Sequence, residues 1–554
     1  MLFQTPEFLV LLSVVLAGLV ALRQAKHQHY FVLAASYVFY GWWDVRFLIL
    51  LLISSMLAYI TALGIKGISL CRRELVTLSG ILATGTLGFL VFNWPLVQGR
   101  VAGRAADSIW LANWTGQRAA VVGTLTLAAL LPWLYTRCLK QKPEARRRVF
   151  MLASVIGNLA ILSFFKYFNF FRDNWIGISD LFGYDAALPA LSIALPVGIS
   201  FYTFQTLSYT LDVYRGDIEP ERSLRRLALF VAYFPQLVAG PILRPSHFLP
   251  SLQELWVLRE ANLRSGFHLI LVGLFKKVLI ADRIAPLSNL IFSHPQGQPS
   301  IVIMYGALLF TVQIYCDFSG YTDIARGIGR IMGIEIPLNF DFPYFSRSVT
   351  EFWRRWHISL SSWLRDYLYI SLGGNRRGPM LTYFNLMATM VLGGLWHGAA
   401  WNFVIWGAYQ GLLLCLNRLA SNWIDGHAAL RRRFDTTAMA CVTWAITFYF
   451  TVLGWIIFRV SDIDDLRSAV GSYIFFDGRF EVSSLGLGNA APFSTTVVFL
   501  LFVVLHTAGY FWRRWPEALD RAPRAAQAAA YVGLGFVFFY LWPSERAPFI
   551  YFQF

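Results

Sequence analysis

The sequence predicts an all-α polytopic membrane protein. Of its 554 residues, 57% are hydrophobic and only 14% are charged, whereas an average soluble domain carries about 25% charged residues. Apolar stretches approaching or reaching the length of a membrane helix, roughly 17 to 25 residues, recur from one end of the chain to the other. Because a helix satisfies its own backbone hydrogen bonds in lipid and an open sheet does not, we expect about eleven to fourteen spanning helices.

The clearest apolar stretches are residues 8–22, 75–92, 121–135, 150–168, 439–458 and 495–510. The first is short, like a signal peptide, but it has no basic residue before it, so we expect it to be retained as the first span. The net charge of +16 is concentrated between the stretches, most densely in "RCLKQKPEARRR" (137–148). The positive-inside rule places this loop and "RQAKH" (23–27) in the cytoplasm and the N-terminus outside. The charge therefore indicates topology, and no nucleic-acid partner is expected.

The polar connections are too short or too apolar to form an independent core, so we expect a single membrane-embedded domain over residues 1–554. Within it, residues 191–411 mix proline, glycine and charge into apolar sequence, as in "LPVGISFYTFQ" and "YFPQLVAGPILRP". Irregular helices at membrane depth are tolerated only where protein or a water-filled cavity covers them. This region is therefore expected to be the catalytic core, with the flanking spans as scaffold.

The five cysteines are scattered and form no C-x-x-C pair, so they are interpreted as small packing residues. No metal site and no bound cofactor are expected.

The stretch "EFWRRWHISLSSWLRDYLYI" (351–370) is unusually polar for this chain. Read as one helix, it places an aromatic and aliphatic stripe opposite a polar stripe. The apolar stripe consists of Phe352, Trp356, Leu360, Trp363 and Tyr367, and the polar stripe of Arg355, Ser359, Ser362 and Asp366. His357 lies on the flank of the apolar side, so its imidazole is expected to face the protein interior. The alternative is an interfacial amphipathic helix whose histidine is only a packed core residue.

A second Trp-His pair follows in the apolar stretch "VLGGLWHGAAWNF", which contains His397 and three glycines, Gly393, Gly394 and Gly398. An ionisable residue inside a span is costly and is a candidate functional residue. The glycines would let another helix or a thin substrate approach the backbone closely, which would leave His397 accessible. The alternative is glycine-mediated helix packing with an incidental histidine.

A neutral imidazole in a low-dielectric site can accept a proton at neutral pH. His397 could therefore activate a hydroxyl or a thiol for attack on a thioester carbonyl, with His357 orienting the substrate, polarising the carbonyl or relaying the proton. A metal site is the rival use of two histidines, but neither has a His, Cys or carboxylate neighbour at the spacing of H-E-x-x-H. A Ser-His-Asp triad is not supported either, because no G-x-S-x-G motif is present.

Four long motifs carry a resemblance to a known family: "YCDFSGYTDIARGIGRIMGI" (315–334), "NFDFPYFSRSVTEFWRRWHISLSSWLRDYLYISLGGNRRG" (339–378), "GGLWHGAAWNFVIWGAYQG" (393–411) and "PFIYFQF" (548–554). They resemble the membrane-bound O-acyltransferase (MBOAT) family, within it the bacterial alginate O-acetyltransferase branch. The upstream motifs "SYVFYGWWD", "FFKYFNF" and "AGPILRP" fit the same branch.

The resemblance implies a helical shell around a central funnel, with the acyl donor approached from the cytoplasm and the acceptor from outside. It implies that His397 is the catalytic histidine and His357 the second functional histidine. Relatives in the branch act in the bacterial inner membrane. They pass acetyl from a cytoplasmic thioester, in expectation acetyl-CoA, toward hydroxyls of an exported polysaccharide. A periplasmic SGNH-type acetyltransferase or esterase usually completes delivery, and membrane lipid surrounds the protein.

The chain departs from the branch at residues 75–135, which read as an additional transmembrane hairpin. The other candidate site residues are polar or aromatic neighbours of the two histidines or residues of the 315–334 motif: Trp356, Trp396, Asp317, Ser319, Asp323, Arg354, Arg355, Arg365, Asp366 and Asn375. Intramembrane carboxylates need a partner, so a structural pairing of Asp317 or Asp323 with arginine is an alternative to a direct catalytic role. Asn375 could instead cap a turn.

Two other classes of function compete with an acyltransferase. A polysaccharide exporter or small-molecule transporter would also explain broken helices and buried polar residues, but no inverted repeat is visible in the sequence. A catalytically idle scaffold for a periplasmic partner is the third class. The two intact Trp-His pairs argue against it.

Overall fold

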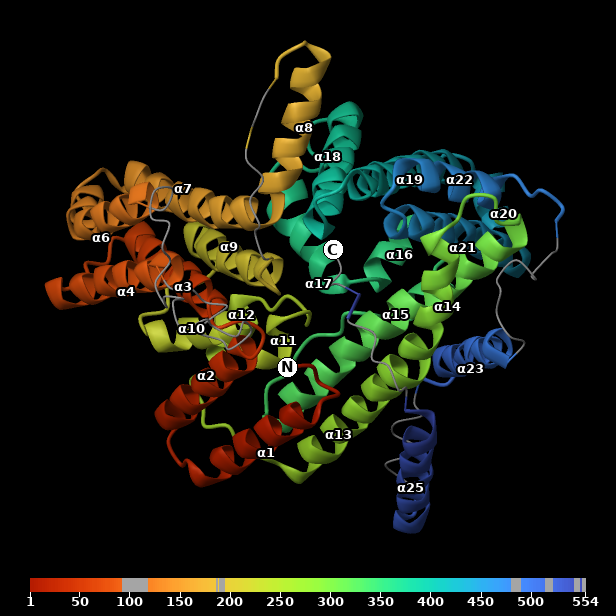
Figure 1. Ribbon diagram of the computed structural model, residues 1–554, viewed down its shortest axis with the longest axis horizontal. Coiled ribbons are helices and arrows are strands. Elements are labelled where there is room, and N and C mark those ends of the chain that lie inside the picture. The colour runs from red at the N-terminus through yellow and green to blue at the C-terminus, as the bar shows by residue number, and fades with distance from the viewer. Residues whose placement is uncertain are drawn as a thin grey trace, which may run out of the picture. The chain divides into compact units, whose positions relative to one another are not determined.

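The computed structural model describes residues 1–91, 118–185, 188, 195–479, 490–513, 522–542 and 549–550, and every regular element within them is a helix (Figure 1). Seven stretches of the described chain are long and apolar enough to cross a membrane: Phe47–Lys66, Val121–Leu139, Pro143–Leu181, Ser300–Ile331, Trp401–Asp425, Thr437–Arg459 and Phe493–Phe511. The prediction of an all-α polytopic protein is confirmed. The described residues supply fewer such helices than the expected total of about eleven to fourteen, partly because helices such as Pro6–Ala21 are shorter.

The contacts divide the chain into two compact units. The first comprises Met1–Phe168, Leu191–Val238 and Leu243–Leu258, and the second comprises Asn169–Ala190, Ala239–Ile242 and Arg259–Phe554. The region 191–411, which we expected to form the catalytic core, therefore contributes to both units. A single domain over residues 1–554 stays a prediction.

The first unit contains α1 (Pro6–Ala21), α2 (Ala25–Gly41), α3 (Phe47–Lys66), α4 (Arg72–Val91), α6 (Arg118–Leu139), α7 (Pro143–Leu162), η1 (Ser163–Tyr167), α9 (Ile199–Arg215), α10 (Leu224–Ala232), α11 (Phe234–Leu237) and α12 (Pro245–Ser251). Helix α3 packs against α7 and α9. The Asn158 side-chain oxygen joins the three helices by accepting hydrogen bonds from Ser54 at 2.7 Å and Thr206 at 3.0 Å. Helices α4 and α6 pack on each other within the predicted extra hairpin, and residues 92–117 lie outside the described part.

The second unit contains a long helix that runs without a gap through three elements. These are α13 (Glu260–Leu274), the π-helical segment η2 (Phe275–Ala281) and α14 (Asp282–Ser293). Its other elements are α15 (Ser300–Ile331), η3 (Pro343–Phe345), α16 (Val349–Arg355), α17 (Ile358–Trp363), η4 (Leu364–Tyr369), α18 (Pro379–His397), α19 (Trp401–Asp425), α20 (Ala428–Phe434), α21 (Thr437–Arg459), α22 (Ile463–Ile474), α23 (Ala490–Phe511) and α25 (Arg524–Leu541). Helix α8 (Phe168–Leu181) belongs to it apart from its first residue.

Helix α15 forms the centre of the second unit: 78% of its most apolar window is buried, against 17% for Phe493–Phe511. It lies alongside α13 (Figure 1). Glycines allow the two backbones to touch, because a Cβ atom on Gly273 would lie 2.5 Å from the Gly320 carbonyl oxygen. A Cβ atom on Gly327 would lie 2.5 Å from the Gly266 oxygen. This is the small-residue contact that membrane helices use in place of a hydrophobic driving force.

The glycines beside His397 serve the same purpose. A Cβ atom on Gly394 of α18 would lie 2.2 Å from the Phe403 oxygen and 2.9 Å from the Gly407 Cα of α19, and one on Gly398 would meet the Phe403 ring at 2.1 Å. Gly393 faces the Leu364 side chain. Of the two approaches that these glycines were expected to permit, the structure shows the approach of another helix.

We expect Gly394→Ala to destabilise the protein by about 1–3 kcal/mol, because the added methyl group has no space at a backbone contact and α18 must move away from α19. Thermal unfolding of the purified protein in detergent measures the loss. Gly533→Ala is the matched control, because a Cβ atom at this helical glycine of α25 meets no atom within 4 Å. Equal midpoints for the two variants would contradict the assigned contact.

Candidate active site

The stretch 351–370 is not one helix. The chain leaves α16 at Trp356, and His357 takes a left-handed conformation with φ 43° before α17 begins at Ile358. The last turn continues as the π-helical η4. The predicted stripes therefore do not run along a single helix, although Phe352, Trp356 and Leu360 are all buried.

The break at His357 is held by residues that precede it in the chain. The Asn339 backbone oxygen accepts from Ile358 N–H at 3.0 Å, and its side-chain oxygen accepts from the Ser359 N–H and hydroxyl at 3.0 and 2.9 Å. Asp341 N–H donates to the Arg355 oxygen at 2.9 Å. A left-handed conformation costs a residue with a side chain about 1–2 kcal/mol, and these hydrogen bonds offset that cost. Such a strained residue is a mark of a functional site when its surroundings enforce it.

The His357 side chain is 0% exposed, so the prediction that it faces the interior is confirmed. Its ring lies edge-on to Phe318, with centroids 4.6 Å apart, and 6.3 Å from the Trp396 ring. The residue lies between two short helices, outside the seven candidate spans. Burial lowers its pKa to about 3, so the imidazole is neutral at physiological pH.

His397 is the last residue of α18 and is 6% exposed. The expectation that its glycines leave it accessible is therefore wrong in this structure, because α19 occupies the space beside Gly394 and Gly398. Its ring packs edge-on against Trp396, Trp406 and Phe458, with centroid distances of 5.0, 5.2 and 5.3 Å. The Trp396 indole therefore contacts both imidazoles, one from its own helix and one from the turn before α17. The structure places the two histidines around one aromatic ring, and their catalytic roles stay predictions.

The two candidate carboxylates of α15 are paired with lysines. Asp317 Oδ1 lies 2.6 Å from Lys277 Nζ, which also lies 2.8 Å from Asp282 Oδ1. Asp323 Oδ2 lies 2.7 Å from Lys276 Nζ, and its Oδ1 lies 3.3 Å from an arginine of the same helix, Arg326. The predicted need for a partner is met, chiefly by lysines of η2 rather than by arginines. Ser319, which lies between Asp317 and Asp323 in the sequence of α15, is also buried.

The remaining candidates separate into an interior and a surface group. Trp356 is 2% exposed and lies 4.7 Å from the Trp455 ring. Arg354 is exposed, and Arg355 is ion-paired with Glu351 at 2.8 Å. Three further polar candidates lie at or beyond the end of α17: Arg365, paired with its neighbour Asp366 at 2.7 Å, and the exposed Asn375. Within the described residues, the contacts of these arginines and of Asn375 do not include either histidine ring.

Sequence reasoning missed Lys277 and Asn339. A signal for Lys277 was present, because "GLFKKVLIAD" (273–282) sets two lysines into an apolar run where charge is costly. Asn339 stands in the quoted "NFDFPYF" motif, but nothing in that motif indicates a bond to a turn further along the chain.

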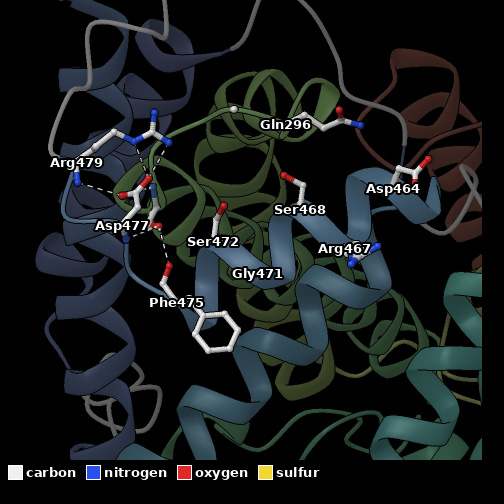
Figure 2. A pocket seen from close by; sticks show the side chains of 11 residues that line it. Gln296, Asp464, Arg467, Ser468, Gly471, Ser472, Phe475, Asp477 and Arg479 are labelled. Atoms are coloured by element: carbon white, nitrogen blue, oxygen red, sulfur yellow. Dashed lines mark hydrogen bonds and ion pairs between the residues drawn. The ribbon is translucent and has the colours of Figure 1, made fainter.

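A surface depression of about 680 Å³ lies between the α14–α15 connection and α22 (Figure 2). Ser300, Ser468 and Ser472 line it, and Asp477 pairs with Arg479 at 2.8 Å on its wall. None of the residues predicted from the sequence lines this depression. It is therefore separate from the histidine site.

Taken together, the fold and the site define a multi-pass helical membrane protein with two buried imidazoles around a tryptophan. The model of the family described as "MBOAT, membrane-bound O-acyltransferase family" matches residues 221–461, which include both histidines. The probable alginate O-acetylase AlgI of Azotobacter vinelandii is 35% identical over 95% of this chain and 88% of its own length. The chain belongs to the membrane-bound O-acyltransferase family, in its alginate O-acetylase-like branch, and is an O-acyltransferase.

Two relatives act on other polymers according to their names. The peptidoglycan O-acetyltransferase of Helicobacter pylori is 35% identical over 61% of this chain and 67% of its own length. The teichoic acid D-alanyltransferase of Bacillus subtilis is 32% identical over 47% of this chain and 68% of its own length. Acyl transfer is thus common to the relatives, while the polymer and the acyl group differ.

Proposed function

We propose that this protein is the O-acetyltransferase of an exported polysaccharide, located in the bacterial inner membrane. It takes acetyl from a cytoplasmic thioester, acetyl-CoA, and passes it to hydroxyls of the polymer or of a periplasmic SGNH-type partner. The observation that carries the proposal is the placement of His357 and His397 around Trp396 in a buried aromatic site.

The chemistry requires a base for a hydroxyl group. The hydroxyl oxygen bonds to the acetyl carbonyl carbon while the carbon–sulfur bond breaks, and the hydroxyl proton passes to the His397 imidazole and then to the departing thiolate. The first proton transfer requires an unprotonated His397 ring. The second histidine, His357, is neutral in its buried position and would orient or polarise the substrate carbonyl.

Charge in the second unit supports donor entry from the cytoplasm. Helix α20, which connects α19 to α21, carries Arg431, Arg432 and Arg433. The positive-inside rule assigns this end of α21 to the cytoplasm, and guanidinium groups suit the phosphates of coenzyme A. At the other end of α21, Phe458 contacts the His397 ring. His397 would then lie toward the side at which the acceptor arrives.

The names of the relatives support the acceptor class. The A. vinelandii relative is named for alginate and the H. pylori relative for peptidoglycan, and both are named for O-acetyl transfer. A hydroxyl-bearing glycan outside the cytoplasm is the substrate class that these two polymers share. The periplasmic partner follows from the family resemblance alone.

Comparison of polymers secreted by wild-type and gene-deleted cells tests the proposal. We expect the deletion to remove ester-linked acetyl from the polymer, measured by release of acetate in mild alkali, while the amount of polymer secreted stays the same. Complementation with the intact gene should restore the esters. Full acetylation in the deletion strain would contradict the proposal, and a loss of secretion would favour an exporter.

A further inference from the structure

The 549–550 segment is buried in the second unit. Phe549 is 1% exposed and Ile550 is 2% exposed. The Ile550 N–H donates to Asp317 Oδ2 at 2.7 Å. The Phe549 ring lies 5.0 Å from the Tyr321 ring and 6.0 Å from the Phe318 ring. Two consecutive residues thus dock onto α15 by one backbone hydrogen bond and two ring contacts.

The carboxylate that receives this hydrogen bond is itself buried. Asp317 uses Oδ1 for Lys277 and Oδ2 for the Ile550 N–H, and the lysine and aspartate side chains are 6% and 4% exposed. A charged pair in such a place requires all its hydrogen-bonding capacity to be met. The 549–550 segment therefore completes the surroundings of Asp317.

The next residue of α15 connects this docking point to the active site. Phe318 packs against Phe549 on one side and lies edge-on to the His357 ring, 4.6 Å away. His357 holds a left-handed backbone conformation, which persists only where the surroundings enforce it. The rings of Phe549, Phe318, His357 and Trp396 form a continuous series of contacts.

We infer that the 549–550 segment is a positioning element for acyl transfer: by fixing Asp317 and Phe318, it holds the His357 imidazole against Trp396. The inference rests on the proposed function for the part that His357 takes in transfer. Phe549 and Ile550 are positioning residues, because they reach the imidazole only through α15. Asp317, which the sequence had marked as a candidate, is then their anchoring group.

Two variants test the inference in the full-length protein. Phe549→Ala removes the ring, and Ile550→Pro removes the N–H donor while keeping an apolar side chain. Phe539→Ala is the matched control, because Phe539 of α25 is 79% exposed. We expect turnover with acetyl-CoA and a soluble oligosaccharide to fall about 10- to 100-fold in the first two variants, since small displacements of a catalytic group have effects of this size. KM for acetyl-CoA should not change.

Hydrogen exchange of backbone amides in detergent gives a readout that does not depend on the activity. Exchange at Ile358 and Ser359, whose amides are bonded to Asn339, should accelerate in Phe549→Ala and Ile550→Pro, with α19 and α21 unchanged. If either variant folds and shows the exchange rates and the turnover of the wild-type protein, the inference is overturned. If the wild-type protein transfers no acetyl, the proposed function fails, whereas accelerated exchange at these two amides would still support the positioning role.

Discussion

Replacing His397 by alanine is expected to lower acetyl transfer by about 10²–10⁴-fold, the contribution of a positioned general base, and to leave the protein folded and inserted in the membrane. The ring lies at the end of α18, where it packs against three aromatic rings. Its loss removes the proton acceptor but none of the glycine contacts between α18 and α19. Transfer is measured as acetate ester on polymer from complemented deletion cells, and folding as the elution profile and unfolding midpoint in detergent.

The control is another histidine in an aromatic surrounding. His506 of α23 lies 4.9 Å from the Tyr315 ring and 5.5 Å from the Phe345 ring, and the proposed chemistry does not use it. His506→Ala should therefore lower transfer by far less than His397→Ala. Retained acetylation in His397→Ala would remove the catalytic assignment. Equal losses in both variants would show that aromatic packing, rather than proton transfer, determines the activity.

The membrane class could be predicted, and the two histidines could be chosen as candidates, because both steps depend on local physics. Long apolar stretches determine the helices, and an imidazole such as His397 in an apolar stretch is conspicuous because ionisable groups are costly there. The glycines beside it were also correctly expected to admit another helix. Their small size acts at the backbone contact itself, as Gly394 shows against Gly407.

The geometry around His357 could not be predicted, because it depends on contacts distant in the chain. Helical periodicity indicated one helix over 351–370, yet Asn339 takes up the backbone and side-chain donors of Ile358 and Ser359 and turns the chain. The arginines of the same stretch were candidates by proximity in sequence. In the structure Arg354 is exposed, and Arg355 pairs with Glu351 one turn earlier in the same helix, α16.

The partner of Asp317 shows the same limit. Sequence reasoning required a partner for the carboxylate, but several cations could supply it. The choice of Lys277 follows from the packing of η2 on α15, where Gly273 and Gly320 bring the two backbones together. The lysine on this close-packed face reaches two carboxylates, Asp282 and Asp317.

Removing that lysine charge should have the largest effect on stability. Lys277 Nζ lies within ion-pair distance of both Asp282 and Asp317, whose side chains are 2% and 4% exposed. Lys277→Met keeps the length of the side chain but leaves two buried carboxylates without their cation. We expect the free energy of unfolding to fall by about 3–5 kcal/mol, as for other broken buried pairs. Thermal or denaturant unfolding in detergent measures the change.

Two comparisons separate buried charge from loss of a lysine. Lys66 pairs with Glu219, whose side chain is 80% exposed, so Lys66→Met should change stability by less than about 1 kcal/mol. Replacing Asp282 and Asp317 by asparagine in the Lys277→Met protein should recover much of the lost stability, because the neutral amides no longer require a cation. The Asp317→Asn side chain can still accept the Ile550 N–H through its amide oxygen. If the triple variant were no more stable than Lys277→Met, the destabilisation would come from altered packing of η2 on α15 and not from the uncompensated carboxylates.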